Sequence, residues 1–176
     1  MTSNLPKREG YLDDLINHLQ SYSGYDRQWA LEQAKYHYEK ELFPLLLLRL
    51  SDHVPINQDI AKQRIIEWSQ RKDFSKLCID YFLDVAMTQI RLRSIDEINQ
   101  LIFYKIQEDT SYFKFVLISS QGKLPRALLA YAVRTKCINH EGLIAWSSKA
   151  KDQLVRALWL NSLIENQNID ALKKIG

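Results

Sequence analysis

Apolar residues recur at helical spacing along almost the whole chain. In the first segment, Tyr11, Leu15 and Leu19 stand four residues apart, so they fall on one face of a helix. Glycine and proline, which tight turns between strands require, number only 5 and 4 among the 176 residues. The two features together predict an all-α protein and argue against a β-sandwich or a β-barrel.

Polar breaks divide this periodicity into ten or eleven short segments. The segment 112–118 also has the aromatic and β-branched content of a strand, but no partner strand is visible elsewhere, so we expect a helix. Short connections favour antiparallel neighbours, and no linker rich in Pro, Gly or Ser interrupts them, so we expect one domain over 1–176. The expected helices span residues 11–19, 25–38, 42–50, 56–70, 74–91, 95–106, 112–118, 124–133, 143–148, 152–165 and 169–175.

Several residues predict where helices begin. Asp26 and Asp73 each precede an apolar helical pattern, as N-cap residues do. Pro44 fits the first turn of its helix, where a missing N–H costs little. Ser94 and Glu97 form a capping-box pattern, in which each side chain bonds the backbone of the other residue.

A short stretch of sequence is repeated within the chain. Leu-Pro-Arg-Ala-Leu-Leu at 124–129 matches Leu-Val-Arg-Ala-Leu-Trp at 154–159, at an offset of 30 residues. A Ser-Ser pair precedes each copy, at 119–120 and 147–148. A helical unit that recurs at this spacing is typical of a solenoid, in which each unit buries its apolar face against the next.

The segment 25–70 resembles a HEAT repeat of the degenerate kind found in bacterial solenoid proteins. A Leu-rich stripe contains Pro44, Asp52 marks the turn, and the small residue Ala61 lies in the following helix. Asn57-Gln58 stands where the family has Val-Arg. Later units have the arginine, at Arg126 and Arg156, but have Ser120 or Gln121 and Ala150 where the aspartate is expected. The resemblance is therefore partial over 110–165.

The resemblance implies a fold more than an activity. It implies an α–α superhelix of stacked antiparallel helix pairs, of the HEAT or armadillo kind, with a concave face lined by second helices. That fold mostly serves as a binding scaffold, so it implies a partner and no particular reaction.

Charge is distributed unevenly along the chain. Residues 1–88 hold 11 basic and 13 acidic residues, whereas residues 89–176 hold 13 and 8. A basic half attracts acidic protein surfaces or nucleic acid. An alternative for Arg126 and Arg156, implied by the resemblance, is that they hold a neighbouring turn. The predicted partner-binding residues are Lys123, Arg126, Arg134, Lys149, Lys151 and Arg156.

No motif for catalysis, a cofactor or a metal is present in the sequence. His37 and Glu41 could share a helix face, as could Asp80 and Asp84, but such pairs are usually ordinary surface residues. The isolated Cys78 and Cys137, which have apolar neighbours, predict buried reduced thiols. We expect core positions for at least three of the four tryptophans, Trp29, Trp68, Trp146 and Trp159.

The sequence also predicts a cytoplasmic location. The first residues lack the apolar core of a signal peptide. The longest apolar run, 42–48, is far shorter than the roughly 20 residues that a membrane-spanning helix needs. We therefore expect a soluble protein that has no contact with a membrane.

Together these observations favour a non-catalytic protein that binds a protein partner 1:1. A dedicated inhibitor, such as an immunity protein that neutralises a toxin, is one concrete form of it. The alternative is a nucleic-acid-binding protein that uses the basic half, including a DNA glycosylase-like enzyme in which Trp159 and Arg156 take part. A scaffold for enzyme assembly or for cofactor attachment is a third possibility.

Overall fold

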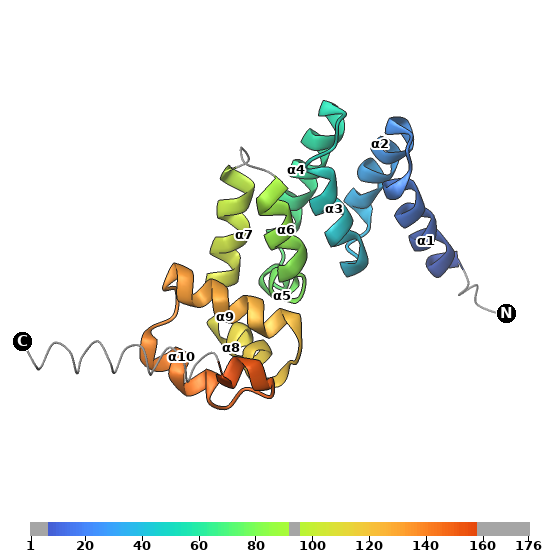
Figure 1. Ribbon diagram of the computed structural model, residues 1–176. Helices are drawn as coiled ribbons and strands as arrows, with labels where there is room; N and C mark the ends of the chain where they lie inside the picture. Colours follow the sequence, from blue (N-terminus) through green and yellow to red (C-terminus); the bar gives the residue numbers. More distant parts are fainter. Residues whose placement is uncertain (1–6, 92–95, 158–176) are drawn as a thin grey trace, which may run out of the picture. The chain divides into compact units, whose positions relative to one another are not determined.

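The computed structural model describes residues 7–91 and 96–157, and this part of the chain is helical and contains no strand (Figure 1). The chain divides into two compact units, the first ending at Lys105 and the second beginning at Ile106. In chain order the α-helices are α1 (Lys7–Gln20), α2 (Gly24–Gln33), α3 (Phe43–Arg49), α4 (Pro55–Trp68), α5 (Phe74–Asp80), α6 (Phe82–Arg91), α7 (Asp96–Glu108), α8 (Thr110–Ser119), α9 (Lys123–Thr135) and α10 (His140–Ser147).

Two short 3-10 helices and one further helical stretch complete the described elements. The 3-10 helices η1 (Ala34–Tyr36) and η2 (Lys40–Leu42) lie between α2 and α3. Residues 153–157 are helical and follow α10. The all-α prediction is therefore confirmed, and so is the helix over 112–118, which lies inside α8.

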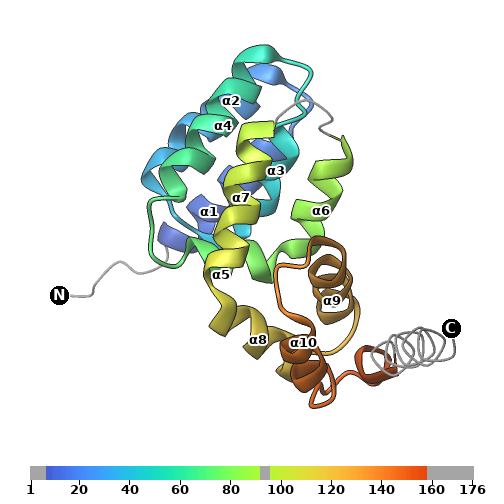
Figure 2. The same cartoon turned by 90° about the vertical axis from the view of Figure 1, so that its left-hand side faces the viewer.

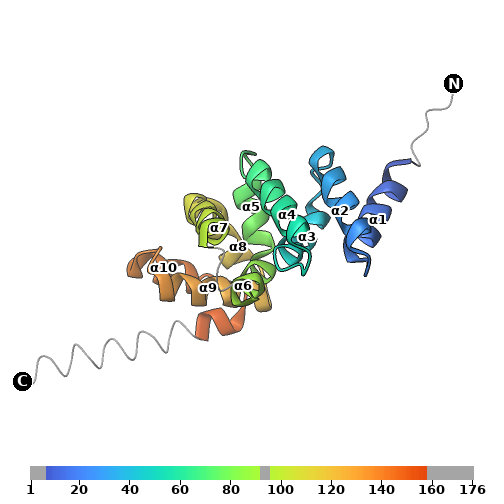
Figure 3. The ribbon, with the colours of Figure 1, turned by 90° about the horizontal axis from the view of Figure 1, so that it is seen from above.

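In the first unit the helices pack as successive pairs. Helix α1 contacts α2, and α3 contacts α4, while α1 also contacts α3 and α2 contacts α4. Figure 3 shows α1 to α4 side by side from above. Helix α6 packs against α3 as well as against α5. Each helix of one pair thus has a counterpart in the next.

The second unit has the same kind of packing on a smaller scale. Helix α8 contacts α9, and α10 contacts both of them, as Figure 2 shows. Its buried apolar residues come from the end of α7, from these three helices and from the segment after α10: Ile106, Phe113, Val116, Leu117, Leu128, Leu129, Tyr131, Ala132, Leu143, Ala150 and Val155.

An aromatic cluster forms part of the first unit's core. The ring of Phe43, at the start of α3, lies 5.7 Å from that of Phe74, 6.0 Å from that of Tyr81 and 6.3 Å from that of Trp68, between centroids. These separations are typical of favourable aromatic packing. Pro44 follows Phe43 in the first turn of α3, as the sequence predicts.

The predicted helix over 74–91 is in fact two helices that meet at Tyr81. Tyr81 has φ −100° and ψ 27°, outside the helical range, and it separates α5 from α6. The break allows the adjacent rings of Tyr81 and Phe82 to pack differently, with Tyr81 against Phe43 and Phe82 buried. The apolar periodicity alone does not distinguish this arrangement from one long helix.

The helix starts differ from prediction in detail. The N-cap of α2 is Ser23, whose hydroxyl accepts a hydrogen bond from the backbone N–H of Asp26 (3.3 Å), so Asp26 lies inside the helix. Asp73 does stand at the N-cap of α5, but its side chain makes no capping bond and pairs with Arg71 (3.9 Å). Helix α2 ends at Gln33, short of the predicted residue 38.

Some predictions fall outside the described residues. These are the capping role of Ser94, the helices over 158–165 and 169–175, and the position of Trp159. The single domain over 1–176 stays a prediction. Within the described residues, no helix combines the length and the apolar character needed to cross a membrane.

Candidate functional site

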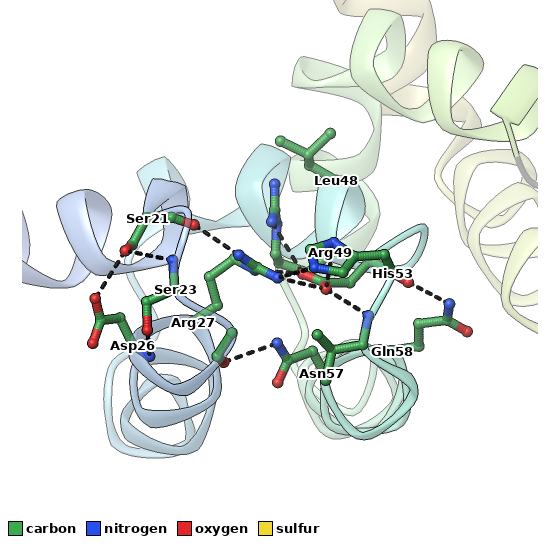
Figure 4. A network of polar contacts seen from close by, with 12 residues as sticks. Ser21, Ser23, Asp26, Arg27, Leu48, Arg49, His53, Asn57 and Gln58 are labelled. Atoms are coloured by element: carbon green, nitrogen blue, oxygen red, sulfur yellow. Dashed lines mark hydrogen bonds and ion pairs between the residues drawn. The ribbon is translucent and has the colours of Figure 1, made fainter.

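A buried ion pair joins α2 to the turn before α4 (Figure 4). Arg27 is 2% exposed, and its Nε and Nη2 atoms donate to the two carboxylate oxygens of Asp52 at 2.7 and 2.9 Å. Its Nη1 atom donates to the backbone carbonyls of Ser21 and Tyr22 at 2.8 and 2.9 Å. One guanidinium therefore links the turn before α2 to the turn before α4.

Asp52 receives further hydrogen bonds in the same place. Arg49 Nη1 donates to its Oδ2 at 3.0 Å, and the backbone N–H of Val54 donates to its Oδ1 at 2.9 Å. Burial alone would raise the pKa of Asp52, but the hydrogen bonds from Arg27 and Val54 outweigh it and lower the pKa to about 2. The carboxylate is therefore ionised at neutral pH.

The two residues that depart from the HEAT pattern take part in the same network. Asn57, which is fully buried, donates its side-chain N–H to the backbone carbonyl of Gly24 at 3.1 Å. The side-chain amide of Gln58 donates to the backbone carbonyl of Asp52. Figure 4 shows both side chains beside Arg27 and His53. Asn57 thus connects α4 directly to the start of α2.

The second unit contains a matching ion pair, between Arg126 of α9 and Asp152. Arg126 Nε lies 3.1 Å from Oδ1 of Asp152, and Arg126 Nη2 lies 2.9 Å from Oδ2. The backbone N–H groups of Gly122 and Leu154 also donate to this carboxylate, at 2.8 and 2.9 Å. The bonds from Arg126 and Gly122 hold the pKa of Asp152 below its ordinary value.

The two ion pairs, which we call the Arg–Asp clamps, share their local geometry. Arg27 and Arg126 are each the fourth residue of their helix, and each aspartate lies in a turn 25 or 26 residues later. Arg156 is also the fourth residue of its helical stretch, and its Nη1 donates to the carbonyls of Ala150 and Lys151. Those carbonyls lie six and five residues earlier, as do the carbonyls that Arg27 binds.

The position of Asp152 shows that one prediction from the repeat pattern, the absence of an aspartate from the later repeat, was wrong. The sequence places Ala150 where the later unit should have the aspartate of the pattern, so that the aspartate is absent. In the structure Asp152, two residues further on, is 2% exposed and serves the second clamp. A turn can supply a carboxylate from a neighbouring position, and alignment by spacing misses such a shift.

The predicted partner-binding residues lie at two ends of α9. Lys123 begins α9 and Lys151 follows α10; the turns that carry them are joined by the second clamp and by a hydrogen bond from the Lys151 N–H to the Ile118 carbonyl (2.7 Å). Lys149, like Lys123 and Lys151, is exposed. Arg134 is exposed in the last turn of α9, which places it about 16 Å from Lys123 along the helix.

Arg126 and Arg156 differ from these four residues because each binds backbone or carboxylate groups of its own unit. Arg126 retains 40% exposure of its side chain while bound to Asp152, and Arg156 is partly exposed. These contacts agree with the alternative that both arginines hold a neighbouring turn. Of the six predicted residues, Lys123, Arg134, Lys149 and Lys151 are therefore the exposed ones without such a contact.

Neither of the two candidate side-chain pairs, His37–Glu41 and Asp80–Asp84, lies on a single helix. His37 follows η1 and Glu41 lies in η2, with a non-helical segment between them. Asp80 ends α5, whereas Asp84 lies beyond the break in α6. Among the described residues, no three potential metal ligands come together. Cys78 is buried as predicted, but Cys137 is partly exposed.

The sequence also misplaced an aromatic surface feature on α2. Trp29 is one of the four tryptophans of which at least three are expected in the core, yet its side chain is 37% exposed and its ring contacts His18 at 4.8 Å between centroids. Tyr22, just before α2, and Tyr25, in its first turn, are 103% and 87% exposed. Helical spacing of aromatic residues was the available signal, but it is the same for a core stripe and an exposed one. Trp68 is buried and Trp146 is half-buried.

Comparisons with models of known families, with curated proteins and with solved structures gave no match.

Proposed function

We propose that this protein is a non-catalytic helical scaffold of the HEAT-like kind that binds one protein partner 1:1, as a dedicated inhibitor of the immunity type does. The observation that carries the proposal is the recurrence of the Arg–Asp clamp. In both units an arginine at the fourth position of a helix binds a carboxylate in a turn about one repeat later. A solenoid needs a recurring link between successive helical repeats, because each repeat is stable only when it packs against the next one.

The packing of the first unit supports the same arrangement. Contacts of α1 with α3 and of α2 with α4 join first helix to first helix and second to second, as stacked helix pairs do. In the second unit α8 and α10 repeat the first-helix contact. A scaffold that is fixed in this way binds with little loss of conformational entropy, which favours tight recognition.

The proposal is tested by affinity capture from lysate of the source cells, with and without nuclease treatment. We expect one protein to be retained in equimolar amount after nuclease treatment, with an interface of about 1,200–2,000 Å² in total. The activity of the retained protein, assayed with increasing amounts of the scaffold, should fall to zero at one equivalent. A partner that remains fully active in the complex would contradict the inhibitor role.

The basic surface residues provide a sharper version of the same test. Lys123→Gln combined with Lys151→Gln should weaken the captured complex, and Lys72→Gln, an exposed lysine of the first unit, is the matched control. Loss of a rim charge is expected to act mainly on the association rate and on its salt dependence. If the double variant and the control bind the partner with equal affinity, Lys123 and Lys151 are not part of the interface.

Nucleic-acid binding is the second candidate, and one observation favours it. Among residues 106–157 eight lysines and arginines stand against four acidic residues, of which Asp152 is buried in the second clamp. If this surface binds nucleic acid, the affinity for a labelled DNA duplex should fall steeply between about 50 and 200 mM salt. An assay for release of alkylated bases then tests the glycosylase-like form. An affinity for the duplex that does not change with salt would exclude both nucleic-acid binding through this surface and the glycosylase-like form.

A further inference from the structure

Exposed aromatic side chains are concentrated in and beside α2. Tyr25 and Trp29 lie four residues apart on α2, Tyr22 precedes its N-cap, and Tyr36 lies in η1; we call these four residues the aromatic row. Their side chains are 103%, 87%, 37% and 73% exposed. The described residues include six exposed aromatic side chains in all, and the other two, Tyr104 and Phe115, lie far along the chain. Four of the six thus fall within fifteen residues.

The core does not account for this row. The opposite side of α2 supplies the buried residues Arg27, Ala30 and Leu31, through which the helix packs in its unit. Exposed tyrosine and tryptophan side chains have few rotatable bonds, so they bury a large area at a low entropic cost when they bind. They are also enriched among the residues that dominate protein interfaces. The row therefore has the composition of an interface.

Carboxylates flank the aromatic row and define the charge of what it would bind. Asp14 pairs with His18 (3.3 Å), whose ring contacts Trp29, so that carboxylate lies beside the row. Glu32 is three residues after Trp29 on α2 and accepts a hydrogen bond from Gln28 (3.1 Å). Asp26 directly follows Tyr25 and accepts a hydrogen bond from the Ser21 hydroxyl (2.8 Å).

Few basic residues lie in the segment that carries the row. Between residues 10 and 36 the two lysine or arginine side chains are Arg27, which is buried against Asp52, and Lys35, which is exposed. Four carboxylates, from Asp13, Asp14, Asp26 and Glu32, stand in the same segment. Within this segment acidic side chains therefore outnumber the exposed basic one, which favours a cationic ligand.

We propose that the aromatic row and its flanking carboxylates bind an arginine- and lysine-rich segment of the protein partner. Aromatic faces attract guanidinium and ammonium groups, and the carboxylates attract the same groups over a longer range. The inference rests on the proposed function, because it names the chemistry of the partner's surface. It also assigns that contact to the first unit, whereas the predicted basic residues belong to the second.

A labelled short oligo-arginine peptide is a direct probe of this surface, with its binding followed by fluorescence anisotropy at low salt. We expect Tyr25→Ala and Tyr36→Ala each to weaken binding about two- to fivefold. Both side chains are so exposed that their loss should leave thermal unfolding unchanged. Phe115→Ala removes a comparably exposed ring of the second unit and should not alter binding.

The charge requirement has its own variants. Glu32→Gln should weaken peptide binding, whereas Lys35→Gln, which removes the exposed lysine beside the row, should strengthen it or leave it unchanged. An oligo-glutamate peptide of the same length should not bind to the first unit. The inference is overturned if Phe115→Ala weakens binding as much as Tyr25→Ala, or if none of the variants of the row has an effect.

The outcome is separable from that of the proposed function. If a 1:1 inhibited complex forms but Tyr25→Ala and Tyr36→Ala leave its affinity unchanged, the scaffold proposal stands and the aromatic row is not its interface. If the row instead holds a second copy of this chain, light scattering will show a dimer that Tyr25→Ala dissociates, and the basic-partner assignment is then wrong.

Discussion

Arg27 and Asp52 illustrate what a buried charge does in a helical protein. Removing a guanidinium and a carboxylate from water costs several kcal/mol for each group, and their attraction and hydrogen bonds roughly offset that cost. Here nearly all the donors of Arg27 are directed at the Asp52 carboxylate and two turn carbonyls. The pair therefore fixes the geometry of two turns more than it adds net stability.

Asp52→Asn should be strongly destabilising, because it leaves the buried Arg27 charge without its counter-charge. We expect a loss of about 3–5 kcal/mol in the free energy of unfolding, measured by urea denaturation at pH 7. Asp59→Asn is the matched control, since Asp59 is exposed and pairs with Lys62 at 3.4 Å on the surface. Its effect should stay within about 0.5 kcal/mol. Equal effects of the two variants would show that the buried pair is not needed.

Stability should also depend on pH through Asp52. Its pKa is about 2 in the folded chain against 3.8 for an ordinary aspartate, so ionisation favours the folded state. This contribution is fully present above pH ~4 and is lost as the pH falls towards 2, by about 2 kcal/mol in all. The stability difference between the wild-type protein and Asp52→Asn should shrink over that window. A difference that stays constant from pH 5 to pH 2 would contradict the assignment.

At the scale of single helices, the start of α9 depends on a glycine conformation. Gly122 has φ 92° and ψ −148°, a region that other residues rarely adopt, and its N–H donates to Asp152. This backbone geometry directs the N–H at the carboxylate of the second clamp. The helix start is therefore coupled to a residue thirty positions later.

Gly122→Ala should destabilise the protein by about 1–3 kcal/mol through backbone strain alone, because an added Cβ would meet no atom within 4 Å. Gly10→Ala is the opposite case. Gly10 lies inside α1, where an added Cβ also meets no atom, so alanine should stabilise by about 0.5–1 kcal/mol. Thermal unfolding of both variants should show a lower melting temperature for Gly122→Ala and a higher one for Gly10→Ala. A similar decrease for both variants would contradict the role of the Gly122 backbone conformation.

The elements themselves show what periodicity can predict. The apolar spacing correctly indicated helices at α1, α3, α4 and α8, since an amphipathic helix must repeat its apolar face. It joined α5 to α6, because apolar residues recur at helical spacing on both sides of Tyr81 and only their packing distinguishes two helices from one. Similarly, the sequence predicted Asp26 as the cap of α2, whereas the backbone path places Ser23 there.

At the scale of the whole molecule, the two clamps lie in different compact units and share no residue. Substitutions that have no shared partner usually add in their effect on stability. Asp52→Asn and Asp152→Asn should therefore shift the urea midpoint by independent amounts. The double variant should show the sum of the two shifts, and a shift well below or above that sum would reveal that the units stabilise each other through the clamps.

The candidate site could be predicted only in part. Lys123, Arg134, Lys149 and Lys151 are exposed, as expected from charge, but charge alone did not indicate which of them lie at the same end of α9. Arg27 and Asp152 were not singled out, because a charged residue in a sequence gives no sign of whether it is buried. A signal was present for Arg27 only in retrospect, in its match to the helix positions of Arg126 and Arg156.

By itself, the amino-acid sequence determined that the chain is helical and where most helices lie, because helix formation depends on residues a few positions apart. Tertiary structure decided which polar groups are buried, which carboxylate each arginine binds, and which face of α2 carries aromatic rings into solvent. Those outcomes depend on contacts between residues that lie about 25 positions apart, as Arg27 and Asp52 do. Such contacts form only when whole helices pack, so local patterns do not contain them.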